Sequence, residues 1–279
     1  MPFVAGTGPA EDGGSGTSTT GRGLVGESTS QAGVVGTSQS AVGAWGESTG
    51  ADGVHGISHS GYAGVAGMND DAQGGAGIWG ESQHDEGVHG ISHSNRGGVA
   101  GYNDGTGPAV YGESTGTGVH SAGFFLGNVT VTGEIVTANA DCAEEFDLSP
   151  AAGPQGAVVR AGTVVVLDED GALRASAEPY DKRVAGVVSG AGNYKPGLIL
   201  DRHDSLVARV PVALLGKVYC DVDADADPIE VGDPLTTSSR PGHAMKASDP
   251  AKAFGAVLGK ALRSLDSGQG QLPVLVALR

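Results

Sequence analysis

The first half of this chain lacks lysine, since the first lysine is Lys182. Residues 1–138 carry 13 aspartates and glutamates against only Arg22 and Arg96, which gives a net charge of −11. An acidic surface of this kind repels phosphate groups, and this excludes binding to nucleic acid or anionic lipid through a basic patch. We therefore expect no nucleic-acid partner, and partners that are neutral or basic.

Long hydrophobic runs are also missing. No segment reaches the roughly 18 apolar residues that a membrane helix needs, and the opening MPFVAGTGPAEDGG lacks the charged and apolar regions of a signal peptide. The sequence thus predicts no membrane span and no signal peptide. Two cysteines, Cys142 and Cys220, are too few for a disulfide framework, and the sequence leaves open whether they pair.

Glycine is abundant where lysine is absent, because 35 of the 50 glycines lie in residues 1–133. Short tetrads, most of them bounded by glycine at both ends, recur there at a nearly constant spacing. They are GLVG (23–26), GVVG (33–36), GAWG (43–46), GVHG (53–56), GVAG (64–67), GIWG (77–80), GVHG (87–90), GVAG (98–101), AVYG (109–112) and GVHS (118–121).

A longer period is superimposed on the tetrads. Trp45, His55 and Val65 recur as Trp79, His89 and Val99, at one shared offset and in nearly identical surroundings. We call this offset the long period. Three units per long period match a three-sided winding of short strands, with glycine at the corners allowing tight bends. The many interior glycines argue against helix, and collagen would need glycine at every third position.

Each unit is short and buries little apolar area, so one such chain alone would be marginally stable. Three identical chains wound together would satisfy the free strand edges, and a homotrimer is the preferred assembly. The sequence leaves open whether the shaft is an interleaved triple-stranded β-helix or three β-solenoids side by side. A disordered linker is the competing interpretation, but linkers do not keep Val, Trp and His in register.

Two sets of side chains recur along this shaft. The first pairs an aromatic residue with a glutamate two positions later: Trp45 with Glu47, Trp79 with Glu81 and Tyr111 with Glu113. These rings either fill the corners of a thin prism or form a platform for sugar rings, and the glutamates are candidates for glycan cleavage. The second set is His55, His59, His89 and His93, which form either a polar ladder or, in a trimer, a metal site.

From about residue 133 the tetrads stop and ordinary strand patterns begin. Runs of Val, Leu and Ile bounded by Gly, Pro and Asp predict a compact all-β domain with its own core. The runs are AVVRAGTVVVLD (157–168), KRVAGVVS (182–189), LVARVPVALLGKVYCDVD (206–223), AFGAVLGKAL (253–262) and LPVLVAL (272–278). Asp249 and Pro250 predict the one helical turn, which extends to about Phe254.

The stretch Ala140–Phe146, ADCAEEF, resembles the Asp-Tyr-Ala-Glu signature that opens the intramolecular chaperone domain of phage tail appendages, a self-cleaving family called peptidase G2. The resemblance extends over residues 139–279 through RVAGVVSGA, PVALLGKVYCDVD, IEVGDPLTTS and GAVLGKAL. It implies a trimeric folding module and hydrolysis of the Ala140–Asp141 bond, with Asp141 and Glu144 as the acting carboxyls. Cys142 replaces the family's tyrosine and Ala140 stands where a serine is expected, so a module that folds without cleaving remains the alternative.

We therefore expect an all-β chain: a flexible leader (1–20), a glycine-rich trimeric β-helix or β-solenoid shaft (21–132) and a compact chaperone-like domain (133–279). The expected role is that of a phage or prophage tail fibre, virion-bound or extracellular, which presents a surface to a cell-surface glycan or receptor. The alternatives are a bacterial surface or secreted repeat protein with the same folding module, and a glycan-cleaving tailspike. No motif calls for a cofactor, and unless the chain is a glycan-cleaving tailspike, any enzyme activity would be a single self-cleavage.

Overall fold

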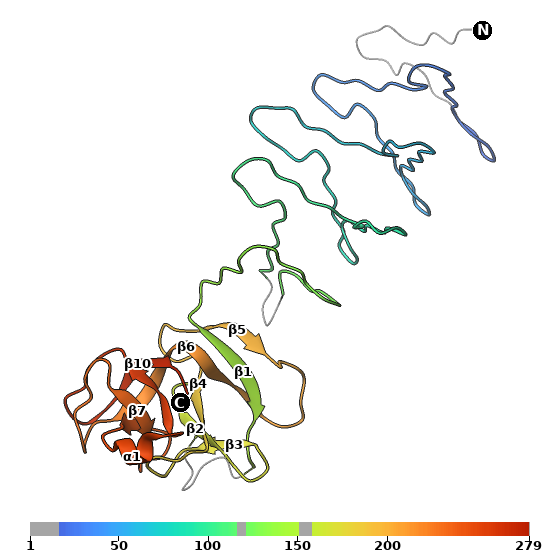
Figure 1. Ribbon diagram of the computed structural model, residues 1–279. Helices are drawn as coiled ribbons and strands as arrows, with labels where there is room; N and C mark the ends of the chain where they lie inside the picture. Colours follow the sequence, from blue (N-terminus) through green and yellow to red (C-terminus); the bar gives the residue numbers. More distant parts are fainter. Residues whose placement is uncertain (1–16, 116–120, 151–157, 279) are drawn as a thin grey trace, which may run out of the picture. The chain divides into compact units, whose positions relative to one another are not determined.

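The structure is a computed structural model that describes residues 17–115, 121–150 and 158–278. The chain divides into two compact units, Met1–Ala122 and Gly123–Arg279 (Figure 1). Of the predicted leader, residues 1–16 lie outside the described part, and so does most of the last tetrad, 118–121. The predicted boundaries at residues 20 and 132 stay predictions.

The first unit forms a series of similar loops, drawn in Figure 1 without a strand arrow. Its described residues, 17–115 and 121–122, contain neither a strand nor a helix. The strand ladder expected of a β-helix or β-solenoid is therefore not present in these described residues of the single chain. A ladder between chains stays a prediction for the assembled protein.

Glycine is required where each loop closes on itself. The last glycine of one tetrad faces the first glycine of the next, and a Cβ added at Gly46 would lie 2.5 Å from the carbonyl oxygen of Gly53. At Gly80 the corresponding distance to the oxygen of Gly87 is also 2.5 Å. No side chain fits at such a distance from the backbone, so the tetrad glycines are needed at the base of each loop, where its two ends approach each other.

Serine forms the turn at the tip of several loops. The Ser38 hydroxyl accepts from the Ala41 amide at 3.0 Å, and the Ser48 hydroxyl accepts from the Ala51 amide at 3.1 Å. Serine hydroxyls stabilise turns in this way by replacing a backbone acceptor. The sequence Gly-x-Ser, which starts at the last glycine of a tetrad, thus provides both the close backbone contact at the base of a loop and the turn at its tip.

The second unit is nearly all β, as the sequence predicts. Its ten strands are β1 (Asp141–Asp147), β2 (Val164–Leu167), β3 (Leu173–Ala175), β4 (Val184–Val188), β5 (Pro196–Leu200), β6 (Arg209–Asp223), β7 (Pro234–Thr237), β8 (Ala244–Lys246), β9 (Val257–Ala261) and β10 (Gln269–Val276). The one helix of the described residues, α1 (Pro250–Ala253), is four residues long, too short to cross a membrane.

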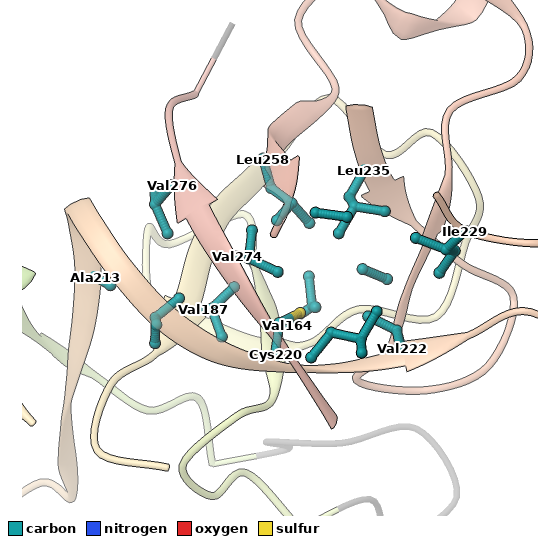
Figure 2. Packing of buried hydrophobic residues seen from close by; sticks show 14 of the residues in the cluster. Val164, Val187, Ala213, Cys220, Val222, Ile229, Leu235, Leu258, Val274 and Val276 are labelled. Atoms are coloured by element: carbon teal, nitrogen blue, oxygen red, sulfur yellow. The ribbon is translucent and has the colours of Figure 1, made fainter. Parts of the chain in front are cut away.

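Five of these strands close into a barrel in the order β6, β8, β7, β9, β10 and back to β6. Its interior is filled by Val, Leu and Ile side chains that point toward one another (Figure 2). Leu235, Ile229 and Leu258 are fully buried there together with the Cys220 thiol. Burying one such aliphatic side chain contributes about 1.5–3 kcal/mol, so this core stabilises the second unit.

Strand β6 connects the barrel to the rest of the sheet. Its first half pairs with β1 and β4, and its second half pairs with β10 and β8. Gly216 is the residue of β6 that pairs with both Asp141 of β1 and Val276 of β10. It has φ +111, and a Cβ there would lie 2.8 Å from the Asp141 Cα. Only glycine suits this crossing point.

Helix α1 and the two cysteines all lie in the second unit. Helix α1 begins after Asp249, whose side chain accepts from the Ala251 amide at 3.0 Å, with Pro250 as first residue. This confirms the predicted turn and its capping.

Cys142 and Cys220 are both free thiols, which answers the open question of their pairing.

Candidate functional site

The second position of most tetrads carries a large aliphatic side chain that the chain itself does not bury. We call these side chains the aliphatic row: Leu24, Val34, Val54, Val65, Ile78, Val88, Val99 and Val110. Their exposed fractions lie between 61% for Val65 and 78% for Leu24. A regular set of exposed apolar side chains marks a surface for association rather than for solvent.

The aromatic residues and their glutamates do come together within each repeat. The Trp45 Nε1 and the Trp79 Nε1 donate to Glu47 Oε2 and Glu81 Oε2, both at 3.3 Å. The Tyr111 hydroxyl donates to Glu113 Oε2 at 2.6 Å. Because an indole N–H and a phenol O–H point along the ring plane, each carboxylate lies at the edge of the ring of its own repeat.

The predicted aromatic ladder is not continuous in one chain. Of the described aromatic rings, Tyr194 and Tyr219 of the second unit are the pair in contact, with centroids 5.1 Å apart. Trp45, Trp79 and Tyr111 remain exposed and do not stack on one another. Their role in filling a prism or in binding glycan remains a prediction for the assembled fibre.

The histidines lie beside acidic residues of their own loops. The His55 Nδ1 is 2.6 Å from Asp52 Oδ2, and the His89 Nδ1 is 3.7 Å from Glu86 Oε1. The strand that was expected to align His55 with His59, or His89 with His93, does not form in the described residues. No group of three or more His, Cys, Asp or Glu side chains in the described ranges is placed to hold a metal ion.

At the start of β1, Asp141 is a buried carboxyl. The residue is 5% exposed, and neither carboxyl oxygen makes a hydrogen bond within the described structure. Burial raises the pKa of Asp141 above its usual range, and the nearby Ser189 hydroxyl opposes this only in part. An ionised carboxylate in such a place is costly, which disposes Asp141 toward holding a proton.

Glu144 does not reach this carboxyl. Between Asp141 and Glu144 the pairing of β1 shifts register against both β5 and β6, and neither Asp141 oxygen is hydrogen-bonded to Glu144. Asp141 lines a hollow that includes Leu198 and Leu215, whereas Glu144 lines another that includes Arg209. The structure does not bring the two predicted catalytic carboxyls together.

The Ala140–Asp141 bond itself is held in the sheet. The Ala140 amide donates to the Lys195 carbonyl at 3.0 Å, and the Ala140 carbonyl accepts from the Lys217 amide at 3.2 Å. The second contact places one N–H donor on the carbonyl that hydrolysis would attack. This is a hydrogen bond of the sheet, and it holds the Ala140 carbonyl in place.

The sequence analysis did not predict two apolar surfaces of the second unit. One is the stretch from Phe124 to Val136, whose large apolar side chains are exposed; its opening run, Phe-Phe-Leu, was a usable signal. The other is an apolar hollow of about 700 Å³ lined by Phe254, Val257 and Leu275. No sequence signal could have found it, because its walls come from α1, β7, β9 and β10.

Comparison with known proteins gives similarity only to solved structures. No family model and no curated protein matches the chain. The C-terminal fragment of bacteriophage phi29 gene product 12 is 16% identical, with 49% of this chain and 100% of that chain covered and a TM-score of 0.33. The head fiber gp8.5 N base of bacteriophage phi29 is 17% identical, with 51% and 93% covered and a TM-score of 0.25. TM-scores below 0.5 do not identify a family, so the case for function depends on the chain's own residues.

Proposed function

We propose that this chain is the subunit of a homotrimeric fibre of the phage or prophage appendage type, whose role is structural and adhesive. The observation that supports it most is the aliphatic row, which presents one exposed Leu, Val or Ile in most tetrads. Full burial of one such side chain contributes about 1.5–3 kcal/mol, so burying the row in every copy strongly favours association. Identical copies are the natural partner, because only they repeat with the same spacing.

Three copies fit the repeat better than two. Three tetrads make up each long period, so one winding has three sides, and three parallel chains can contribute equivalent sides at every level. Backbone groups left without a ladder in the single chain would then pair between chains. This is the β-helical shaft expected from the sequence, either interleaved or side by side.

The second unit serves as the folding module in this proposal. Near-identical repeats can pair in several registers at almost equal free energy, so the shaft specifies its own register weakly. A separate unit with a conventional core, such as the barrel around Leu235 and Leu258, folds independently of that choice. The resemblance of Ala140–Phe146 to the chaperone signature gives the same role.

Self-cleavage at Ala140–Asp141 is the second candidate activity. The buried Asp141 carboxyl next to the bond, which has no hydrogen-bond partner among the described residues, favours it, because a protonated acid beside an amide can donate to the leaving nitrogen. A new terminal amine on Asp141 and a new carboxylate on Ala140 would be the products. Intact mass measured on freshly purified protein and on Asp141→Asn detects or excludes this single hydrolysis.

The trimer is tested by light scattering and electron microscopy on the full chain. A double change in the aliphatic row, Val54→Asp with Val88→Asp, is compared with Gln39→Asp, which adds a charge at an exposed loop tip. We expect a trimeric fibre for the wild type and Gln39→Asp, and dissociation for the double variant. A wild-type monomer at all concentrations would refute the proposal. A separate observation, tail or baseplate genes beside the coding sequence, would distinguish a virion protein from a bacterial surface protein.

A further inference from the structure

The second unit begins with a segment whose sequence is typical of a strand, but which pairs with no strand of the described chain. Residues 128–137 read NVTVTGEIVT, an alternating run rich in β-branched residues, which are typical of strands. The structure nevertheless assigns no strand there, and residues 128–137 make no backbone–backbone hydrogen bond within the described chain. We call residues 123–139 the junction segment.

The junction segment is also the densest stretch of exposed large apolar side chains in its unit. These side chains have exposed fractions from 47% to 96%, and they are Phe124, Phe125, Leu126, Val129, Val131, Ile135 and Val136. The stretch has a single charged residue, Glu134. A nearly uncharged apolar stretch that is exposed in one chain is typical of an interaction surface.

An apolar hollow lies beside its C-terminal end. Ile135 and Thr137 line a space of about 360 Å³ together with Leu198 of β5 and Leu215 of β6. Both leucines are unusually accessible, Leu198 at 52% and Leu215 at 65%. Among the described strands β5 pairs only with β1, so its other edge is free to accept a strand.

We propose that the junction segments of neighbouring copies pair with one another as parallel strands, and that this contact fixes the register of the trimer. The proposal rests on the homotrimeric fibre proposed above and locates the contact that aligns its chains. The partner is a second copy of this chain. Because residues 128–137 have no backbone partner within the described chain, their backbone groups can pair with those of a neighbouring copy.

Charge and connectivity favour a second copy over an unrelated protein. The region before the junction segment is strongly acidic, so identical chains repel one another there. The junction segment adds little to this repulsion, because Glu134 is its one charge. Copies associated through the aliphatic row also hold identical segments at the same level, which raises the effective concentration of each segment for the others.

The junction sequence gives a reason why register would be set here. The tetrads repeat with almost the same residues, so a shift by one long period replaces like with like. NVTVTGEIVT occurs once in the chain. Pairing of this segment with itself therefore has one in-register solution, and a slipped trimer would leave its apolar side chains exposed.

Hydrogen exchange on the full-length wild type tests the pairing directly. Amides of residues 128–137 have no backbone partner in the described single chain, so without pairing they should exchange close to the free-peptide rate. We expect them to exchange at least about 100-fold more slowly in the trimer, because strand pairing blocks exchange except during local opening. A trimer with unprotected amides at 128–137 would overturn the inference and leave the fibre proposal intact, whereas a wild-type monomer would overturn both.

Substitution gives a second readout with a matched control. Ile135→Glu places a charge in the junction segment, and Leu206→Glu places one at an exposed site elsewhere in the same unit. Because burying an unpaired charge is costly, we expect Ile135→Glu to raise the dissociation constant of the trimer at least about 10-fold, while Leu206→Glu leaves it unchanged. Equal trimer stability in both variants would count against the inference. The thermal transition of the barrel, recorded for both, shows whether each unit is folded.

A cysteine scan reports geometry without relying on destabilisation. In-register parallel strands lie about 4.8 Å apart, a separation that a disulfide can bridge. In a Cys142→Ala background, Val136→Cys should form chain-to-chain disulfides on mild oxidation, and Leu206→Cys should not. Equal cross-linking at both positions, or none at residue 136 in a proven trimer, would exclude parallel pairing at this segment.

Discussion

The Trp45 Nε1 donates to Glu47 Oε2 at 3.3 Å, and the same bond recurs at the same length one long period further along, between Trp79 and Glu81. Tyr111 and Glu113 repeat the relationship once more, with a hydroxyl in place of the indole. Each repeat thus keeps the hydrogen bond between the polar group of the aromatic ring and the carboxylate, although the ring changes from indole to phenol.

The pair at Tyr111 makes a prediction that spectroscopy can check. The Glu113 carboxylate accepts from the phenol and opposes its ionisation, which raises the pKa of Tyr111. Glu113→Gln should therefore lower this pKa toward the ordinary tyrosine value, as followed by NMR titration of the ring. Glu47→Gln is the matched control and should leave the Tyr111 titration where it is; a shift in both variants would mean the effect is not local.

Asp141→Asn should stabilise the second unit. The folded state raises the pKa of Asp141, so its ionised form opposes folding above that pKa. Removing a buried, unpartnered carboxylate should raise the free energy of unfolding at pH 7 by about 1–3 kcal/mol. Below the unfolded-state pKa the carboxyl is protonated in both states, so the difference between variant and wild type should shrink. Denaturant unfolding at pH 7 and pH 3 measures this, and a destabilised variant would assign Asp141 a hidden partner.

Gly216→Ala should be far more harmful than Gly171→Ala. Both glycines have positive φ, +111 and +81, so both substitutions strain the backbone by about 1 kcal/mol or more. At Gly216 the added Cβ also meets the Asp141 Cα at 2.8 Å, whereas at Gly171 nothing lies within 4 Å. We expect an additional loss of about 1–3 kcal/mol at Gly216, because β1 must move away from β6. Similar melting temperatures for the two variants would show that β1 yields easily.

Acid should weaken the contact between Asp181 and Arg183. The Arg183 guanidinium donates to both Asp181 oxygens, at 3.0 and 2.7 Å, and lowers the pKa of Asp181 below its usual value. A lowered folded-state pKa means that the stabilisation is present at neutral pH and disappears as the pH falls through the folded pKa.

Asp181→Asn should therefore cost about 1–3 kcal/mol at pH 7 and much less near pH 2. Thermal unfolding recorded at both pH values tests it. Because Arg183 is 45% exposed, the lower end of this range is expected. An equal loss at both pH values would point to packing instead of charge.

Several local features followed from the sequence because neighbours in the chain decide them. Asp249 and Pro250 predicted helix α1, and the apolar runs contained β6 and β9 and most of β10. The pairing of Trp45 with Glu47 was visible as a spacing of two. Strands β3, β7 and β8 are only three or four residues long, too short to show a period.

Composition and spacing were enough to establish the division of chemistry along the chain. The first part is a glycine-rich, lysine-free repeat with a large aliphatic side chain in most tetrads, and the second part has enough Val, Leu and Ile for a core. The packed structure was needed to show that β6 closes a barrel, that Gly216 meets Asp141, and that Asp141 and Glu144 line different hollows. Such relationships join residues far apart in the chain or depend on strand direction, and packing of the whole unit selects them from many pairings that the same pattern allows.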